Sequence, residues 1–214
     1  MRGTELCDKP FSSIQEEIDV YVEAISNLYP IGEINIIGMS GGGNVAHEIA
    51  CIMEERGRVI RFVGLIDSSC PINAFSNTAL SKQMILSNLS REYGVNIEPM
   101  SDYTEMSHIF WRRLVGQNME LGNVTLDVLD RIIDLVWTWV PEYISLSPRK
   151  GNFKIIYFSA EAQVLTKEQL RMRSGWSEYC CAIRYVPVQT IHVRMLYPDA
   201  LKVIVPVIDD ALSE

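Results

Sequence analysis

A serine set among glycines, Gly38-Met39-Ser40-Gly41-Gly42, is the feature of this sequence most able to do chemistry. In the pattern G-x-S-x-G, the serine occupies a sharp turn between a strand and a helix, and the strained backbone projects its hydroxyl above the sheet. The flanking glycines permit the close packing that such a turn demands. A glycine-rich turn or a phosphate-binding loop would be the alternative, but the P-loop lysine and the third glycine of a dinucleotide fingerprint are both missing. We therefore interpret Ser40 as a nucleophile.

A serine hydroxyl is a weak nucleophile at neutral pH and needs a general base, for which the chain offers three histidines. His47 lies about two turns along the helix expected after Ser40, which favours a packing or surface role. His108 falls in a helical segment beside Trp111, where it could line a substrate cavity, although packing is the simpler expectation. His192 follows the last expected strand and precedes the last helix. We predict that His192 is the base.

The base in turn needs a carboxylate that fixes its tautomer and stabilises its positive charge. Asp67 ends the apolar run that follows the elbow helix, at the same edge of the expected sheet as Ser40. Its rival is Glu161, which follows the next apolar run, and a simple turn-capping role for Asp67 is a third reading. The residues alone favour Asp67 without excluding Glu161. The order Ser, Asp, His along the chain is that of α/β-hydrolases rather than of chymotrypsin or subtilisin.

The segments that position these residues alternate between helical and strand patterns. Ser13 and Glu16 have the spacing of a capping box, and apolar residues then recur at helical period. The expected elements are a helix over 14–28, a strand over 34–37, a helix from 44 to a stop at Gly57, a strand over 59–66, a strand over 153–158, a helix over 167–176, a strand over 182–186 and a helix over 199–212. A strand–helix–strand unit of this length implies parallel strands, so the predicted class is α/β with a mostly parallel sheet.

Between about residues 71 and 147 the strand pattern disappears. Three helical segments take its place, over 78–93, 102–115 and 125–143. We predict one all-helical insertion within a single domain covering 1–214. The apolar helices with Trp111, Trp137 and Trp139 suit a long or lipophilic acyl group, or they pack on the core.

Composition excludes several classes of function. The 214 residues are 48% hydrophobic, which excludes a disordered chain, and the net charge of −8 is spread along the sequence with no concentrated basic face. We expect no nucleic-acid partner. No apolar run approaches the roughly 18 residues that a membrane span needs, and residues 1–10 lack the apolar core of a secretory signal. A cytoplasmic location without a membrane partner is the expectation.

The cysteines do not indicate a disulfide framework or a metal site. There are five of them, none in a C-x-x-C pattern, and they stand at positions 7, 51, 70, 180 and 181. His47-Glu48 also fails as a zinc signature, because Cys51 stands where H-E-x-x-H requires a histidine. We expect buried, reduced thiols and no metal.

The stretch from Ile34 to Ser68 resembles the thioesterase domains that end nonribosomal peptide and polyketide synthases. It contains their strand, G-x-S-x-G-G, V-A-x-E-x-A helix and closing L-I-D-S. The resemblance implies that Asp67 is the acid. The segment Ile191-His192-Val193-Arg194-Met195-Leu196 is similar to the centre of the family's histidine segment, which implies that His192 is the base, although Thr190 replaces the usual preceding residue.

This resemblance implies an α/β-hydrolase-type sheet in which the insertion near 71–147 is the lid over the acyl chain. It also implies a thioesterase that releases an acyl or peptidyl chain from the phosphopantetheine of a carrier protein, by hydrolysis or cyclisation. The enzyme itself would hold no cofactor. The Gly41 N–H would be one oxyanion donor.

The sequence departs from this family pattern before the elbow. The family carries several strands, and a loop with a second oxyanion amide, ahead of the helix that begins here near Ser13. Only about 33 residues precede the elbow strand, so we expect an N-terminally shortened fold with no evident second donor. The alternatives are a general carboxylesterase, which the L-I-D-S placement disfavours, and an inactive truncated thioesterase acting as an interaction module.

Overall fold

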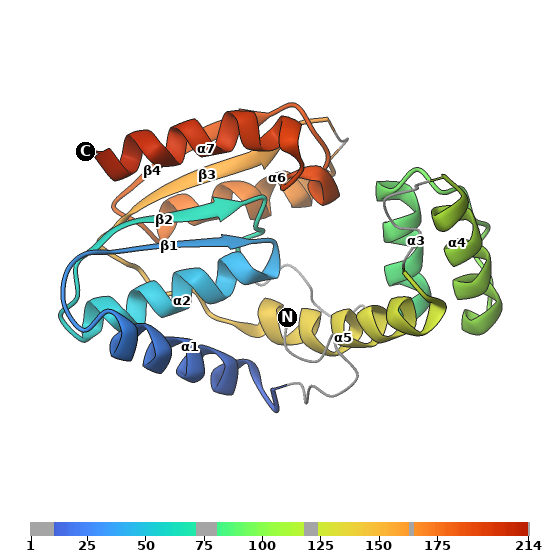
Figure 1. The fold of residues 1–214 in the computed structure, drawn as a ribbon, viewed down its shortest axis with the longest axis horizontal. Coiled ribbons are helices and arrows are strands. Elements are labelled where there is room, and N and C mark those ends of the chain that lie inside the picture. Colours follow the sequence, from blue (N-terminus) through green and yellow to red (C-terminus); the bar gives the residue numbers. More distant parts are fainter. Residues whose placement is uncertain (1–10, 72–80, 118–123, 163–164, 214) are drawn as a thin grey trace. The chain divides into compact units, whose positions relative to one another are not determined.

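The computed structural model describes residues 11–71, 81–117, 124–162 and 165–213 (Figure 1). In chain order the elements are α1 (Ile14–Leu28), β1 (Ile34–Met39), α2 (Gly41–Glu55), β2 (Ile60–Ile66), α3 (Lys82–Glu92), α4 (Tyr103–Gln117), α5 (Leu126–Ser145), β3 (Lys154–Ala160), α6 (Lys167–Ser174), the 3₁₀ helix η2 (Gly175–Glu178), β4 (Ala182–Val188), the 3₁₀ helix η3 (His192–Arg194) and α7 (Pro198–Ser213). Every element expected from the sequence is present, with ends that differ by a few residues.

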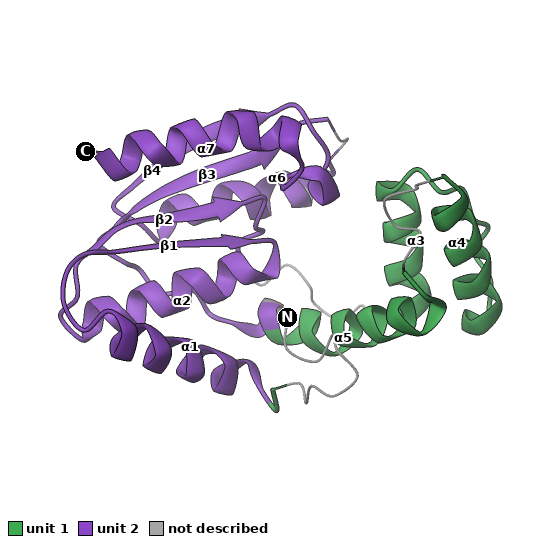
Figure 2. Ribbon diagram, viewed as in Figure 1, with its two compact units in different colours: residues 1–12, 76–142 green, residues 13–75, 143–214 purple. Residues whose placement is uncertain are grey.

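The chain divides into two compact units, which Figure 2 distinguishes by colour. Unit 1 comprises Met1–Ser12 and Ser76–Glu142, and unit 2 comprises Ser13–Phe75 and Tyr143–Glu214. Unit 1 thus contains most of the insertion expected near 71–147. The expectation of a single domain over 1–214 stays a prediction, as does the role of the insertion as a lid.

Unit 2 is built on a four-stranded sheet in the order β1-β2-β3-β4, with every neighbouring pair parallel. Met39 on β1 pairs with Ile66 on β2, and the next pair in this row is Ile66 with Phe158 on β3. The strands therefore end together, and the loops that follow them gather at one edge. The predicted α/β class with a parallel sheet is confirmed.

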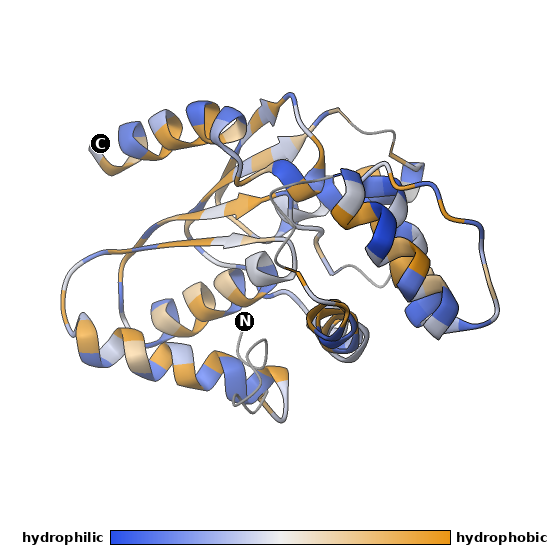
Figure 3. Ribbon diagram, turned by 45° about the vertical axis from the view of Figure 1, so that its right-hand side comes forward, coloured by the Kyte–Doolittle hydropathy of each residue, from blue (hydrophilic) through white to orange (hydrophobic). Residues whose placement is uncertain are grey.

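The helices of unit 2 form where the sequence supplies a cap and an apolar stripe. Ser13 caps α1, because its hydroxyl oxygen accepts a hydrogen bond from the Glu16 N–H at 3.1 Å. Along α1 the buried residues include Ile14, Ile18 and Val22, spaced one turn apart. Hydrophobic and hydrophilic segments alternate around α1 and α2 in Figure 3, as amphipathic helices require.

The two faces of the sheet carry different helices. Helix α7 buries Ala200 and Ile204 in one apolar cluster with Phe62 and Phe158 of the central strands. Helix α2 lies against the opposite face, because Gly43 approaches the side chain of Leu65, and adjacent strand residues point to opposite sides. Since β2 and β3 are buried on both faces, their near-continuous apolar runs are explained.

Unit 1 has a helical core of its own. Leu86 on α3, Phe110 on α4 and Ile133 on α5 are fully buried in one cluster. The hydroxyl of Tyr103 donates to Asp130 at 2.8 Å. The indole N–H of Trp111 donates to the Val124 carbonyl at 2.7 Å, so this side chain packs within the unit. The start of the first expected helix, 78–80, lies outside the described residues.

The described part of the chain has no membrane-spanning helix, and most of its cysteines are buried. None of its helices is long and apolar enough to cross a membrane. Cys51, Cys70 and Cys180 are buried free thiols, as expected, whereas Cys181 is exposed. The expectation of burial is therefore wrong for Cys181, which lies directly before the exposed first residue of β4. Cys7 lies outside the described residues.

Candidate active site

Ser40 occupies the turn between β1 and α2 that the motif predicts. Its φ and ψ angles are 53° and −129°, a conformation that non-glycine residues adopt at a cost of about 1–3 kcal/mol. The Ser40 N–H donates to the Ile66 carbonyl at 3.0 Å, which ties the turn to the end of the neighbouring strand. The backbone strain is thus held by the sheet, and Ser40 stands at its carboxyl edge.

The glycines around Ser40 are required by close packing at three positions. A Cβ at Gly38 would overlap the Gly42 carbonyl, and one at Gly43 would overlap the hydroxyl of Ser68. A Cβ at Gly41 would lie 2.7 Å from the ring of Tyr143. At Gly42, by contrast, nothing lies within 4 Å of an added Cβ. The turn therefore needs glycine at positions 38, 41 and 43, where the backbone or another side chain packs closely against it.

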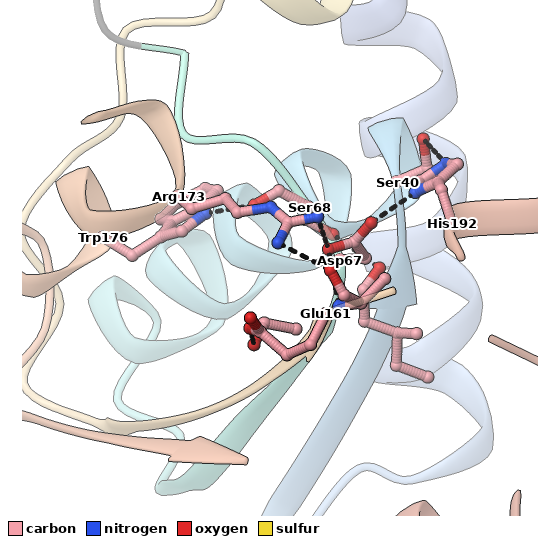
Figure 4. Close-up of polar contacts among 10 residues, drawn as sticks. Ser40, Asp67, Ser68, Glu161, Arg173, Trp176 and His192 are labelled. Carbon is pink, nitrogen blue, oxygen red and sulfur yellow. Dashed lines mark hydrogen bonds and ion pairs between the residues drawn. The ribbon is translucent and has the colours of Figure 1, made fainter. Parts of the chain in front are cut away.

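His192 joins Ser40 to Asp67 (Figure 4). Its Nε2 atom lies 3.1 Å from Ser40 Oγ, and its Nδ1 atom lies 2.7 Å from Asp67 Oδ2. A carboxylate only accepts hydrogen bonds, so the Nδ1–H donates to Asp67 and Nε2 is left to accept from the serine hydroxyl. The three residues expected from the sequence are brought together, with separations suited to proton transfer.

Asp67 is buried, with 6% of its surface exposed, at the residue directly after β2. Its φ of 49° is the second positive value among non-glycine residues in the described ranges. The Asp67 N–H donates to the Phe158 carbonyl at 2.8 Å. While Oδ2 faces His192, Oδ1 accepts from the Ala160 N–H at 3.1 Å and from Arg173 at 2.6 Å. The carboxylate is therefore fixed on both oxygens.

Glu161, the rival acid, has a different position. It follows β3 and its side chain is exposed. Its Oε1 atom accepts a hydrogen bond from the hydroxyl of Ser159. Of the two carboxylates, Asp67 is the one that bonds His192.

His47 and His108 have other surroundings. His47 is 1% exposed, with its ring against Trp176 and Phe153 at centroid distances of 4.9 and 5.4 Å. Burial lowers the pKa of His47 to about 4, so this ring is neutral at physiological pH. The packing role expected for His47 is confirmed. His108 is exposed on α4, so the packing expected for it is wrong.

The thiol of Cys51 lies beside His47, and a thiol next to an imidazole is a second possible nucleophile–base pair. Cys51 Sγ lies 3.9 Å from His47 Nδ1. Burial raises the pKa of Cys51 to about 12, however, and the neighbouring Glu48 adds to the shift. A thiol becomes reactive when its pKa falls, so this pair is inert packing.

Sequence reasoning missed the support around Asp67. Arg173 and Trp176, both buried, come from α6 and η2, more than a hundred residues after Asp67. The sequence shows Arg173 only as one member of a local basic group with Lys167 and Arg171. Nothing in that pattern separates the buried arginine from its exposed neighbours.

The family model described as "Thioesterase domain" matches residues 2–112, just over half of the chain. The chain belongs to the thioesterase domain family. Ser40 and Asp67 fall within the matched region of this thioesterase domain, while His192 lies beyond it.

Two curated relatives of the thioesterase domain are nonribosomal peptide synthetases. The chain is 32% identical over 94 residues to the nonribosomal peptide synthetase pngA of Aspergillus terreus, covering 44% of the chain. It is 31% identical over 98 residues to tyrocidine synthase 3 of Brevibacillus parabrevis, covering 46% of the chain. The matched segments are only 10% and 2% of those synthetases' lengths.

Among solved structures, the Vlm2 thioesterase domain bound with a dodecadepsipeptide superimposes with a TM-score of 0.67. The alignment covers 98% of this chain and 79% of that one, at 18% sequence identity. This likeness shows that the two share a fold. The family match makes the chain a thioesterase domain, and the likeness to the Vlm2 domain is in line with that family.

Proposed function

We propose that the chain releases an acyl or peptidyl group from the phosphopantetheine thiol of a carrier protein, using Ser40, His192 and Asp67 as a catalytic triad. The observation that carries this proposal is the hydrogen-bonded series from Ser40 Oγ through His192 to Asp67, with steps of 3.1 and 2.7 Å. It lies at the carboxyl edge of a parallel sheet, where sites of α/β proteins are found.

In the first half-reaction Ser40 Oγ attacks the carbonyl carbon of the thioester, and its proton passes to His192 Nε2. The tetrahedral intermediate then collapses, the carbon–sulfur bond breaks, and the pantetheine thiol leaves with the proton from His192. The product is an ester between the acyl group and Ser40. Asp67 holds the imidazole by its Nδ1–H and stabilises its positive charge while the proton resides on Nε2.

In the second half-reaction a nucleophile attacks the acyl–Ser40 ester and gives its proton to His192. Water yields a free acid, and a hydroxyl or amine within the acyl chain yields a ring. The proton returns from His192 to Ser40 Oγ as the ester bond breaks. Which product forms depends on water exclusion around the acyl chain.

The oxyanion of both intermediates needs hydrogen-bond donors. Gly41 is the first residue of α2, and helix geometry leaves the N–H groups of the first turn without acceptors inside the helix. We assign the Gly41 N–H as a hydrogen-bond donor to this oxyanion. One such donor is worth about 10²–10³ in rate.

Labelling of the nucleophile tests the proposal. The full chain is treated with a fluorophosphonate and its intact mass is compared with that of Ser40→Ala. We expect one phosphonyl adduct on the unaltered chain and none on the variant. An unlabelled but folded protein would contradict the enzymatic role and support an interaction module instead.

The substrate class is tested by comparing matched thioester and oxygen-ester substrates. Acyl thioesters of pantetheine and acyl esters of a simple alcohol with the same acyl group are offered to the same preparation. We expect kcat/KM to be higher for the thioester. A preference for the oxygen ester would support the carboxylesterase alternative.

A further inference from the structure

Arg173 is a buried cation joined to the acid of the proposed triad. Only 11% of its side chain is exposed, and one guanidinium nitrogen lies 2.6 Å from Asp67 Oδ1. A second guanidinium nitrogen donates to the Ala160 carbonyl at 3.0 Å. The N–H of the same Ala160 donates to Asp67 Oδ1 at 3.1 Å. Arg173 and the end of β3 thus hold the same carboxylate oxygen, while the other oxygen faces His192.

The helix that carries Arg173 is fixed to the segment after Asp67. The Cys70 N–H donates to the Met172 carbonyl at 2.9 Å, and the indole N–H of Trp176 donates to the Ser68 carbonyl at 2.7 Å. These bonds lie on both sides of Arg173 in the sequence, and Figure 4 shows the one between Trp176 and Ser68. The position of the guanidinium is therefore set by the fold rather than by a flexible surface side chain.

We propose that Arg173 is a positioning residue of the triad, which orients the Asp67 carboxylate toward His192 and offsets part of its negative charge. This proposal rests on the proposed function for its catalytic consequence. A carboxylate paired on one oxygen with a fixed guanidinium has fewer orientations available. It also attracts a proton on His192 less strongly than an unpaired carboxylate would, because the positive charge opposes protonation of the ring.

Other ionisable groups surround this pair. Tyr157 lies on β3 close enough to interact electrostatically with Asp67 and Arg173, and Glu161 and Tyr185 act on Tyr157 in turn. Burial raises the pKa of Tyr157 far above its usual range, so the phenol is neutral across the working pH. Arg173 and the His192 ring both contact Asp67 directly, whereas Tyr157 is neutral and Glu161 is exposed.

Three variants separate the positioning role from a merely structural one. Arg173→Gln keeps a hydrogen-bond donor and removes the charge, while Arg173→Lys keeps the charge and loses the two-pronged contact. Arg171→Gln is the matched control, because Arg171 lies in the same last turn of α6, is exposed and carries the same charge.

The first readout is the pH dependence of the rate of fluorophosphonate labelling. For Arg173→Gln we expect the midpoint of the acidic limb to rise by about one pH unit, the scale of a charge interaction at this range. The plateau rate falls by about 3–30-fold as the carboxylate loses its orientation. Arg173→Lys keeps the midpoint and loses part of the rate, and Arg171→Gln changes neither. A folded Arg173→Gln that matches Arg171→Gln in both quantities would overturn the proposal.

The second readout does not depend on reactivity. The C–H resonances of the His192 ring are followed by NMR across pH, with assignments confirmed by His47→Gln and His108→Gln. We expect the His192 titration midpoint to rise in Arg173→Gln even if Ser40 proves unreactive, so failure of the proposed function is distinguishable from failure of this inference. If Arg173→Gln does not fold, the proposal is tested with Arg173→Lys. Fluorophosphonate labelling at the rate of the unaltered chain would overturn the proposal. Slower labelling with an unchanged midpoint of the acidic limb would support it.

Discussion

The turns after β1 and β2 place the two ends of the proposed triad. Each turn holds a non-glycine residue at a positive φ angle, but different contacts stabilise the two turns. Ser40 and Asp67 both have positive φ angles, 53° and 49°, and neither is glycine. The Ser40 turn is held by close approach of the Gly42 backbone to Gly38 and of the Ser68 side chain to Gly43. The Asp67 turn is held by polar contacts, chiefly the ion pair to Arg173.

This difference bears on how each turn fails. A turn held by close packing is sensitive to any added atom, because the neighbouring atoms have no room to move apart. A turn held by a buried ion pair is sensitive to loss of either partner, because the remaining charge is left in a poorly solvated site. Substitutions can therefore be chosen that remove the close packing or the ion pair separately.

The largest effect is expected from Asp67→Asn. His192 loses the charge that stabilises its protonated form, so kcat/KM for a pantetheine thioester should fall by about 10³–10⁴-fold. The uncompensated Arg173 should also reduce the free energy of unfolding by about 3–5 kcal/mol. Glu161→Gln is the control, since that exposed carboxylate follows β3 without bonding His192, and it should change kcat/KM less than twofold. Equal losses in both variants would contradict the assignment of Asp67 as the acid, and a larger loss in Glu161→Gln would reverse it.

The next largest effect is expected from Gly43→Ala, which disturbs the close packing of the Ser40 turn. Its Cβ would overlap the Ser68 hydroxyl, so the elbow helix or the Asp67 turn must shift, at about 1–3 kcal/mol in the free energy of unfolding measured with urea. Gly42→Ala is the matched control, because nothing lies within 4 Å of that Cβ. It should be neutral or stabilising by up to about 1 kcal/mol. The comparison fails if the two variants unfold alike.

The third prediction concerns His47, whose ring packs on Trp176 and so supports the Asp67 side from α2. Burial lowers the pKa of His47 to about 4 from 6.5, so the unfolded chain binds the proton more readily between these values. Stability is therefore present above pH 6.5 and is lost as the pH falls through this window, by about 2 kcal/mol between pH 7.5 and 5. The destabilisation caused by His47→Gln should shrink by that amount over the same range. His108→Gln, at an exposed position, should show no such trend.

The smallest effect is expected from Glu17→Gln, beside the Ser40 turn. Tyr143 packs its ring on Gly41 and donates its hydroxyl to Glu17 at 3.4 Å. Burial raises the pKa of Glu17 above 4.5, so the folded chain holds that proton more tightly and loses stability as the pH rises through the raised pKa. The glutamine variant should gain stability relative to the unaltered chain between pH 4 and 7. The exposed Glu23→Gln on the same helix should not, and a loss of stability in Glu17→Gln would contradict this reading.

The contrast between the turns also explains what the sequence could predict. The Ser40 turn is specified by residues within about five positions, and the period of the flanking segments placed β1 and α2 correctly. Asp67 and His192 could be proposed because parallel strands end at one edge. The ion pair from Arg173 joins α6 to a residue that precedes it by more than a hundred positions. No local pattern encodes such a contact, since Arg171 and Arg173 both adjoin Met172 in the last turn of α6, yet Arg171 is exposed and Arg173 is buried.

The central claim is that the two turns act together on one acyl group through His192. Its most direct test is rapid mixing of the chain with an acyl-pantetheine thioester, followed by acid quench, intact mass and peptide mapping. We predict an adduct of one acyl mass on the peptide that contains Ser40, formed much more slowly in His192→Ala and not at all in Ser40→Ala. An acyl group on another residue, or unchanged turnover by Ser40→Ala, would contradict the account.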